Sequence, residues 1–434
     1  MTTRPDPAAE PGADLSVQPG AAGPASATAA PSPTRRRVTA APAPTRRRVT
    51  AAILALALGG FGIGVTEFAA MGLLRSIADG FGLTEPQAGN VITAYALGVV
   101  VGAPLLTVWT SRWRRRTLLL VLMALFTVGN VAAAFAPTAE LLVAARFVAG
   151  IPHGAYFGVA SLVAASLAGP GRQARAVSQV LLGLSVANVI GVPAATWLGE
   201  SIGWQSAFLA VGVIGALTVA AILVVVPEPT GTVVVRAREE LAALARPQIL
   251  ATLAVGCVGF GGMFAIYTYI QWTMVDVAGI DRAWMPAVLA VYGLGMVAGN
   301  IVGGIVADRD LDRGLVGIAA VMTLVLAGFA LAAHHPVTAV IGLFLVGTTG
   351  SALVPGLQSR LMRHAGRGQT LAAALNHSAL NAANALGAWL GGVVIAFGWG
   401  YTSPALAGAA LAALGLAILV VAVRSVRKGE TAAP

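Results

Sequence analysis

The chain has 434 residues, of which 57% are hydrophobic and only 10% are charged, and its mean hydropathy is +0.82. A soluble domain carries about 25% charged residues, so this composition excludes a water-soluble globular protein and indicates a chain that is solvated by lipid. The single cysteine, Cys257, excludes a disulfide framework and a cysteine-based metal site, and the net charge of +10 must be explained by where the basic residues lie.

The first 48 residues differ in composition from the rest of the chain. They are rich in Pro, Ala, Ser and Thr, lack aromatic residues, and carry the first of two copies of TRRRVTAA, at 34–41 and 45–52. Such a segment cannot bury enough apolar surface to offset the entropy of ordering, so we predict a disordered cytoplasmic tail. The apolar run that follows is too long for a secretion signal and has no small-residue cleavage site after it.

Twelve later segments are long and apolar enough to cross a membrane, which takes about 20 mainly apolar residues. They lie at 49–74, 88–110, 117–136, 140–167, 176–199, 204–226, 248–275, 284–307, 315–334, 336–358, 369–396 and 402–423. We therefore predict an all-α integral membrane protein of two six-helix bundles. The predicted parts are the tail 1–48, a bundle at 49–227, a cytoplasmic linker at 228–247, a second bundle at 248–425 and a cytoplasmic tail at 426–434.

The basic residues predict the orientation of the spans. Alternate connections and the two tails hold 24 of the 27 basic residues, whereas the remaining connections hold only Arg75 and Arg282, and Arg146 lies inside a span. Basic residues are retained on the cytoplasmic side, so we predict a multi-pass protein of the cell membrane with both termini in the cytoplasm. The net charge then reflects topology and does not indicate a nucleic-acid surface.

Two pairs of segments indicate an internal duplication. The sequence YALGVVVG at 95–102 matches YGLGMVAG at 292–299, 197 residues later, and ANVIG at 187–191 matches ANALG at 383–387, 196 residues later. The shared offset relates the second span to the eighth and the fifth to the eleventh. Six spans were therefore duplicated in parallel, as in transporters that alternate access by rocking two halves about a site at the midplane.

Four segments carry a resemblance to a known family: GVTEFAAMGLL at 64–74, RFVAGIPHG at 146–154, VPGLQSRLM at 354–362 and NALGAWLG at 384–391. With the segment at 95–106 they make the chain similar, over about 49–425, to the major facilitator superfamily. Within it the chain resembles the drug:proton antiporter branch and its sugar-efflux (arabinose-efflux-permease-like) group. The resemblance implies proton-coupled efflux of a small organic molecule, such as a drug, a sugar or a metabolite.

The chain departs from the family pattern at two places. Ser111 stands where the loop after the second span has an aspartate in the family, and Thr196 and Trp197 replace the glycines of the antiporter motif in the fifth span. Because that motif is what indicates exchange, a proton symporter or facilitator for nutrient uptake remains an alternative. A membrane receptor or scaffold is a third hypothesis, but it predicts a sizeable folded soluble domain, which the sequence lacks.

Glu67 is the only acidic residue well inside a predicted span, and an ionisable group at that depth is a functional candidate by default. Burial and nearby charges alter how tightly a carboxyl holds its proton. A carboxyl whose surroundings change as two halves rock can therefore bind a proton from one side and release it to the other. Helical rise places Arg146 at the same depth, so we expect it to be the counter-charge. The alternative is a static ion pair that only fixes packing.

His153 and His377 are the only histidines within predicted spans, and helical rise places them at similar depths. Histidine changes charge near neutral pH, so a proton or substrate role is one interpretation and a hydrogen-bonded interior side chain is the other. Because no acidic or cysteine partner lies nearby, the two histidines predict no metal site.

Several polar or aromatic side chains are candidates for lining a substrate cavity: Tyr95, Asn188, Tyr267, Tyr269, Gln271 and Asn384. Aromatic faces with a few polar tips suit uncharged organic substrates, and helical spacing places Tyr267 and Gln271 on one face. The alternatives are aromatic residues at the membrane interface and hydrogen bonds that join helices.

The resemblance also implies a cytoplasmic gate at Arg112, Asp308 and Arg309, in which Asp308 acts through Arg309 and the N-terminus of a helix. The alternative is an ordinary solvated loop charge. The chain has no phosphate-binding Gly-Lys-Ser/Thr loop and no Ser or Cys nucleophile with His and Asp support. We therefore expect no enzyme activity, no catalytic or metal-binding residue and no cofactor. The expected partners are a small-molecule substrate, protons and the lipid bilayer, with no nucleic acid, and we expect a monomer.

Overall fold

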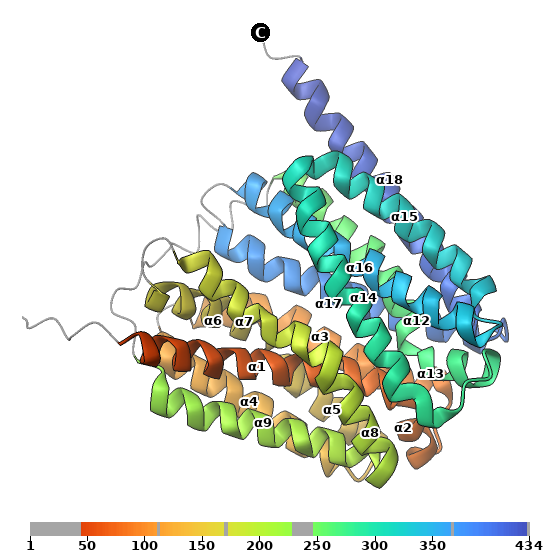
Figure 1. The fold of residues 1–434 in the computed structure, drawn as a ribbon, viewed down its shortest axis with the longest axis horizontal. Helices are drawn as coiled ribbons and strands as arrows, with labels where there is room; N and C mark the ends of the chain where they lie inside the picture. Colours follow the sequence, from red (N-terminus) through yellow and green to blue (C-terminus); the bar gives the residue numbers. More distant parts are fainter. Residues whose placement is uncertain (1–44, 111–112, 169–171, 228–245, 366–368, 432–434) are drawn as a thin grey trace, which may run out of the picture. The chain divides into compact units, whose positions relative to one another are not determined.

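The computed structural model describes residues 45–110, 113–168, 172–227, 246–365 and 369–431 (Figure 1). Within these ranges the chain is helical without strands, and twelve helices are long and apolar enough to cross a membrane. This confirms the predicted class and number of spans. The predicted tail 1–48 and linker 228–247 lie almost wholly outside the described residues, so the domain boundaries stay predictions.

The first six spans are built from nine helical elements, because two of the spans are interrupted. The elements are α1 (Arg46–Gly72), α3 (Glu85–Trp109), α4 (Arg115–Ala134), α5 (Ala139–Gly150) with α6 (His153–Ala168), α7 (Gln173–Val186) with η1 (Ala187–Gly191) and α8 (Val192–Ile202), and α9 (Trp204–Val225). The short helix α2 (Leu74–Phe81) connects α1 to α3. The break between α5 and α6 falls at Pro152, whose ring removes a backbone donor and obstructs a continuous helix.

The last six spans include one that is interrupted several times. The seventh consists of α11 (Pro247–Ala254), η2 (Val255–Gly259), α12 (Gly261–Thr268), α13 (Ile270–Trp272) and η3 (Thr273–Val277). The short helix η4 (Arg282–Trp284) follows it. The remaining five spans are α14 (Met285–Arg309), α15 (Leu311–Ala332), α16 (Pro336–Ala365), α17 (Gln369–Ala396) and α18 (Ser403–Thr431). The tenth span ends at Ala365, beyond its predicted end at 358. We call the end of the helices that carries α2 and η4 the α2 end, and the opposite end the terminal end.

The duplication is visible in how two pairs of helices touch. A methyl group added at Gly98 of α3 would collide with the carbonyl oxygen of Phe147 in α5, and one added at Gly295 of α14 would collide with that of Phe344 in α16. Gly98 and Gly295 are 197 residues apart, and so are Phe147 and Phe344. This is the offset between the repeated segments at 95–102 and 292–299. Glycine lets backbones approach closely where lipid supplies no hydrophobic drive, so the repeat preserves the same close contact twice.

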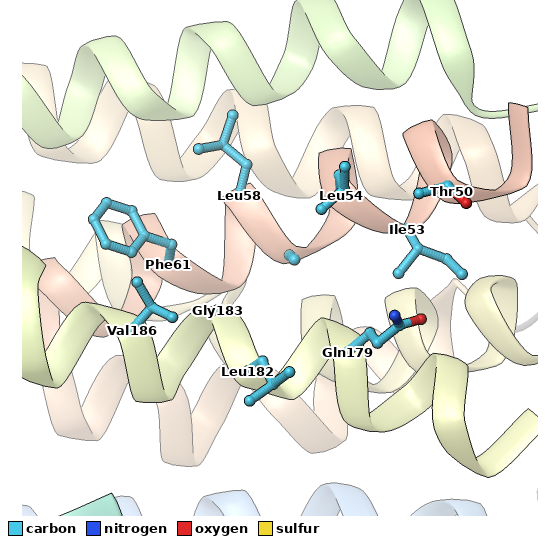
Figure 2. Close-up of a pocket in the computed structure, with 10 residues that line it drawn as sticks. Thr50, Ile53, Leu54, Leu58, Phe61, Gln179, Leu182, Gly183 and Val186 are labelled. Carbon is cyan, nitrogen blue, oxygen red and sulfur yellow. The ribbon is translucent and has the colours of Figure 1, made fainter. Parts of the chain in front are cut away.

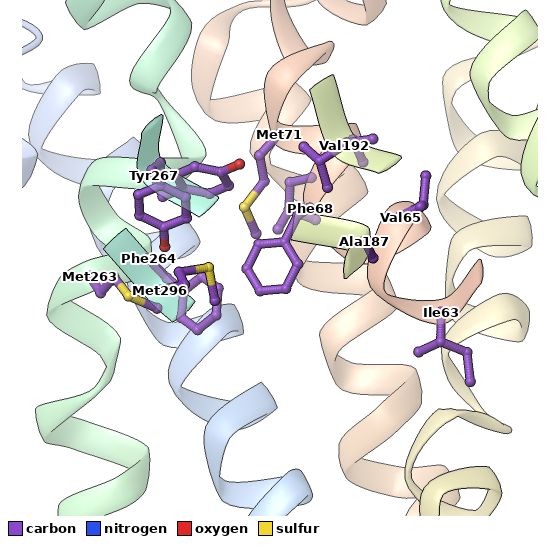
Figure 3. Packing of buried hydrophobic residues seen from close by; sticks show 14 of the residues in the cluster. Ile63, Val65, Phe68, Met71, Ala187, Val192, Met263, Phe264, Tyr267 and Met296 are labelled. Carbon is purple, nitrogen blue, oxygen red and sulfur yellow. The ribbon is translucent and has the colours of Figure 1, made fainter. Parts of the chain in front are cut away.

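The first six spans pack mainly on one another, as do the last six, and the two sets meet along a few helices. α3 packs along α17, and α14 packs against η1 and α8. Near the centre, Phe68 of α1 lies 6.2 Å from Phe264 and 5.9 Å from Tyr267, measured between ring centroids. Figure 3 shows these rings beside Met71 and Met296, so an aromatic and methionine-rich contact joins the two sets.

Candidate functional site

Arg146 of α5 is fully buried and is held by the residue before Glu67. Its Nη1 donates to the Thr66 hydroxyl at 2.8 Å, and its Nη2 donates to the Thr66 carbonyl at 3.1 Å. The Thr66 hydroxyl in turn donates to Oδ1 of Asn130 in α4. The flat guanidinium also lies 4.3 Å from the ring centroid of Tyr95, a cation–π contact that suits arginine. Four helices therefore fix this cation at the centre of the first six spans.

Glu67 lies close to this cation without pairing directly with it. The two charges are near enough to interact, but no carboxylate oxygen comes within 4.0 Å of an Arg146 nitrogen, so the expected ion pair is not formed in this structure. In the part of the chain that the structure describes, Glu67 makes no hydrogen bond, and 7% of its surface is exposed. The Arg146 donors go to Thr66 instead.

Two tyrosines from matching positions of the duplication flank Glu67. Tyr95 of α3 and Tyr292 of α14 both lie close enough to Glu67 to interact with its charge. The Tyr95 hydroxyl lies 3.0 Å from Nδ1 of His153. Tyr292 stacks on Tyr267 with ring centroids 4.1 Å apart, and its buried hydroxyl has no hydrogen-bond partner among the described residues. Glu67 thus lies between the two sets of spans.

The two membrane histidines come together across the two sets. The ring centroids of His153 in α6 and His377 in α17 are 6.0 Å apart, and Phe157 stacks on His377 at 5.4 Å. Helical rise predicted a shared depth but not this contact, which depends on how the helices are rotated. No group of three metal-binding side chains occurs among the described residues, so the pair lacks a third ligand there.

The predicted face shared by Tyr267 and Gln271 does not exist, because the helix is interrupted between them. α12 ends at Thr268 and Tyr269 leaves the helical conformation, with φ −108° and ψ 19°. As a result Tyr267 points toward Tyr292 at the centre, whereas Gln271 bonds to Glu200 at the α2 end. Tyr269 donates to the carbonyl of a residue in α17 at 2.9 Å. Tyr267 therefore contacts Phe68, the residue after Glu67, and Tyr292.

Comparison with known protein families matches the chain to the Major Facilitator Superfamily over residues 56–368 and 287–434. The chain belongs to the major facilitator superfamily. The inner membrane transport protein YdhP of Escherichia coli (strain K12) is 41% identical over 379 residues, which cover 87% of this chain and 97% of that protein. A chloramphenicol resistance protein of Streptomyces lividans is 31% identical over 367 residues, covering 84% and 94%.

Solved structures agree on the fold of this major facilitator. A D-xylose–proton symporter has a TM-score of 0.67 over 86% of this chain and 97% of its own, at 18% sequence identity. The predicted family and fold are therefore confirmed, and the chain is a multi-pass membrane protein that performs secondary transport.

The two asparagines of the repeat have different surroundings. Asn188 lies in η1, its amide donates to the Leu184 carbonyl at 3.1 Å, and its backbone packs closely on Gly293 of α14. Its side chain therefore makes no hydrogen bond to another helix among the described residues, and the close contact with α14 is made by its backbone. Asn384 of α17 is 1% exposed, and neither polar atom of its side chain has a hydrogen-bond partner within the described ranges. It is the better candidate for a polar ligand.

The expected gate at the terminal end lies partly outside the described residues and stays a prediction. Arg112 lies outside the described residues, and Asp308 and Arg309 form no hydrogen bond or ion pair in the part that is described. Arg360, which the sequence assigned to a loop, is instead 1% exposed inside α16 and pairs with Asp312 of α15.

An apolar groove of about 370 Å³ lies between α1 and α7 toward the terminal end (Figure 2). Its walls are Ile53 and Leu54 on one side and Leu182 on the other, with Thr50 and Gln179 as polar groups. The sequence did not single out these residues, because each looks like ordinary apolar or small polar lining in a spanning helix.

The α2 end holds polar contacts that the sequence did not predict. Arg282 of η4 pairs with Glu200 of α8 at 2.6 Å, and Arg75 pairs with Asp276 of η3 at 2.8 Å. Arg75 and Arg282 were the two exceptions to the arginine asymmetry. An arginine on the side of the membrane that is poor in basic residues was therefore the signal for a special role.

Proposed function

We propose that this protein exports a small organic molecule in exchange for protons and that Glu67 carries the coupling proton. The observation that carries the proposal is the arrangement of Glu67 itself. Among the described residues it is the only acid deep within the spans, it lies between the two sets of helices, and it has no direct ion pair although Arg146 is near. An unpaired buried charge is costly. Glu67 is therefore stable either as the protonated carboxylic acid or as a carboxylate whose charge Arg146 compensates.

The exchange between these two conditions provides the coupling step. Arg146 is fixed by Thr66 and Tyr95 within the first six spans, whereas Tyr292 of the last six lies close enough to Glu67 to interact with its charge and stacks on Tyr267. When the two sets rock, the tyrosines move relative to the cation, and the balance between the protonated and the charged acid changes. The proton thus binds in one orientation and leaves in the other.

The arginines support the orientation in the membrane that the proposal requires. In this proposal the protein spans the cell membrane with both termini in the cytoplasm, and the α2 end faces the outside. The relative named as a chloramphenicol resistance protein supports export, and the apolar groove between α1 and α7 offers room for an organic molecule. Arg146 serves as counter-charge, and His153 and His377 lie on the cytoplasmic side of Glu67.

The first experiment identifies a substrate. We would compare the susceptibility of a host with and without the gene across a chemically varied panel that includes chloramphenicol. The compound with the largest gene-dependent tolerance is then used in proteoliposomes with an imposed pH gradient. Net movement of the substrate together with the protons, into the compartment that the protons enter, would contradict antiport and favour the symport alternative.

The second experiment tests Glu67. Glu67→Gln keeps size and hydrogen bonding but removes titration, so we expect gradient-driven accumulation to fall at least about tenfold while downhill exchange of labelled substrate persists. Glu140→Gln is the matched control, because Glu140 is an exposed acid at the start of α5. If Glu67→Gln concentrates substrate as well as the parent protein, the coupling site lies elsewhere and His153 is the next candidate.

A further inference from the structure

Glu200, near the end of α8, is the centre of a hydrogen-bond network that crosses the two sets of spans. Arg282 of η4 donates to both carboxylate oxygens, through Nε at 2.6 Å and Nη2 at 3.3 Å. Ser76 of α2 donates to Glu200 at 2.8 Å and accepts from Arg282 at 2.6 Å. Gln271 of α13 donates to Glu200 at 2.9 Å. An acid of the first six spans is thus held by two donors of the last six.

Further contacts at the α2 end also join the two sets. Arg75 pairs with Asp276 at 2.8 Å, and the Tyr401 hydroxyl donates to Glu85 at 2.7 Å. The hydrogen bond to Asp276 raises the pKa of Arg75, and burial, helped by the bond to Glu85, raises the pKa of Tyr401 to about 12. Both side chains therefore remain donors throughout the physiological pH range.

Ion pairs at the terminal end are different in kind. Arg313 pairs with Asp310, and Arg360 pairs with Asp312, so both pairs lie within the last six spans. In the described part of the chain, ion pairs that connect the two sets occur only at the α2 end. The two arginines that form them, Arg75 and Arg282, are the ones that stand outside the arginine asymmetry.

We propose that Glu200, Arg282, Ser76 and Gln271 form a latch that holds the two sets of spans together at the external end and opens for each release of substrate. The proposal rests on the export cycle above, because that cycle requires this end to separate. The bidentate pairing of arginine with a carboxylate gives the latch a defined geometry. Its side chains are 38% exposed at Arg282 and 18% at Glu200, so water can replace the contacts as the end opens.

The latch makes a prediction about a buried neighbour. Thr196 of α8 is fully buried where Leu289 of α14 meets Gly72 of α1. Separation of the two sets at the α2 end would expose it. We would introduce Thr196→Cys in a Cys257→Ser background and measure the rate of modification by a water-soluble maleimide in detergent. With the latch intact we expect slow modification.

Breaking the latch should increase this rate. Glu200→Gln keeps the shape of the side chain but loses the charge, and Arg282→Gln removes the bidentate donor. We expect each to accelerate modification of Thr196→Cys about tenfold, since loss of one charge-assisted pair shifts an equilibrium by roughly that factor. Arg313→Gln is the matched control, because it removes an arginine from an ion pair at the opposite end and should leave the rate unchanged.

The two proposals fail in distinguishable ways. The measurement in detergent needs neither substrate nor a proton gradient, and gel filtration with thiol counting after denaturation verifies folded protein. If Glu200→Gln and Arg282→Gln label as slowly as the parent, the latch is overturned while the role of Glu67 stands. If either variant does not fold, Ser76→Ala removes one bridging hydroxyl more gently, and an unchanged rate in that variant also overturns the latch.

Discussion

At the scale of single residues, the structure changes which partner Arg146 has. The sequence paired it with Glu67 because both lie at one depth, but depth does not define direction around a helix axis. The guanidinium donates twice to Thr66, whose hydroxyl donates onward to Asn130. This leaves Glu67 near a positive charge yet free of a direct pair, which is the condition that a switching carboxylate needs.

The bridging hydroxyl of Thr66 is open to a direct test. Thr66→Val keeps the shape but removes the acceptor of Arg146 and the donor to Asn130, so two buried polar groups lose a partner. We expect destabilisation by about 1–3 kcal/mol, measured as a lower melting temperature in detergent. Thr218→Val is the control, since this buried hydroxyl bonds only to the Ile214 carbonyl of its own helix. Equal shifts for both variants would contradict the proposed bridge.

At the scale of helical elements, the duplicated glycines predict paired effects. Gly98→Ala and Gly295→Ala each place a methyl group against a backbone carbonyl that cannot move independently. Overpacking of this kind costs about 1–3 kcal/mol, and the two losses should be similar because the contacts are equivalent. Melting temperatures of the purified variants measure them.

Glycines of α15 provide the control for that pair. Gly317 and Gly328 have open space where a Cβ would lie, and alanine favours a helix over glycine by roughly 0.5–1 kcal/mol. Gly317→Ala and Gly328→Ala should therefore leave stability unchanged or raise it. Unequal losses at Gly98 and Gly295 would show that the two close contacts are not equivalent.

At the scale of the whole molecule, the arginine asymmetry predicts one orientation. A reporter fused after Pro434 should be active only in its cytoplasmic form, because the cytoplasmic side retains basic residues. The matched fusion is made at Gly279, in the connection between η3 and η4 at the α2 end, and should be active only in its external form. The reverse pattern would invert the topology and the direction of the proposed latch.

The sequence predicted the fold in detail but the candidate site only in part. Twelve spans, the duplication and the family follow from apolar runs, repeated glycines and motifs, all of which can be counted along the chain. Tyr95 and Arg146 do lie close to Glu67, as candidates for one site should. Gln271 does not, because the interruption at Tyr269 turns the helix.

By itself the sequence determined the properties of each segment: the length of the span, its lipid environment, its predicted orientation in the membrane and the segment that duplicates it. These depend on composition and spacing, which local physics fixes. Only the tertiary structure decided which side chains meet across helices, as in the contacts of Thr66 with Arg146, His153 with His377 and Glu200 with Arg282. Such contacts depend on the rotation and tilt of packed helices, and those are set by the fit of many small residues at once.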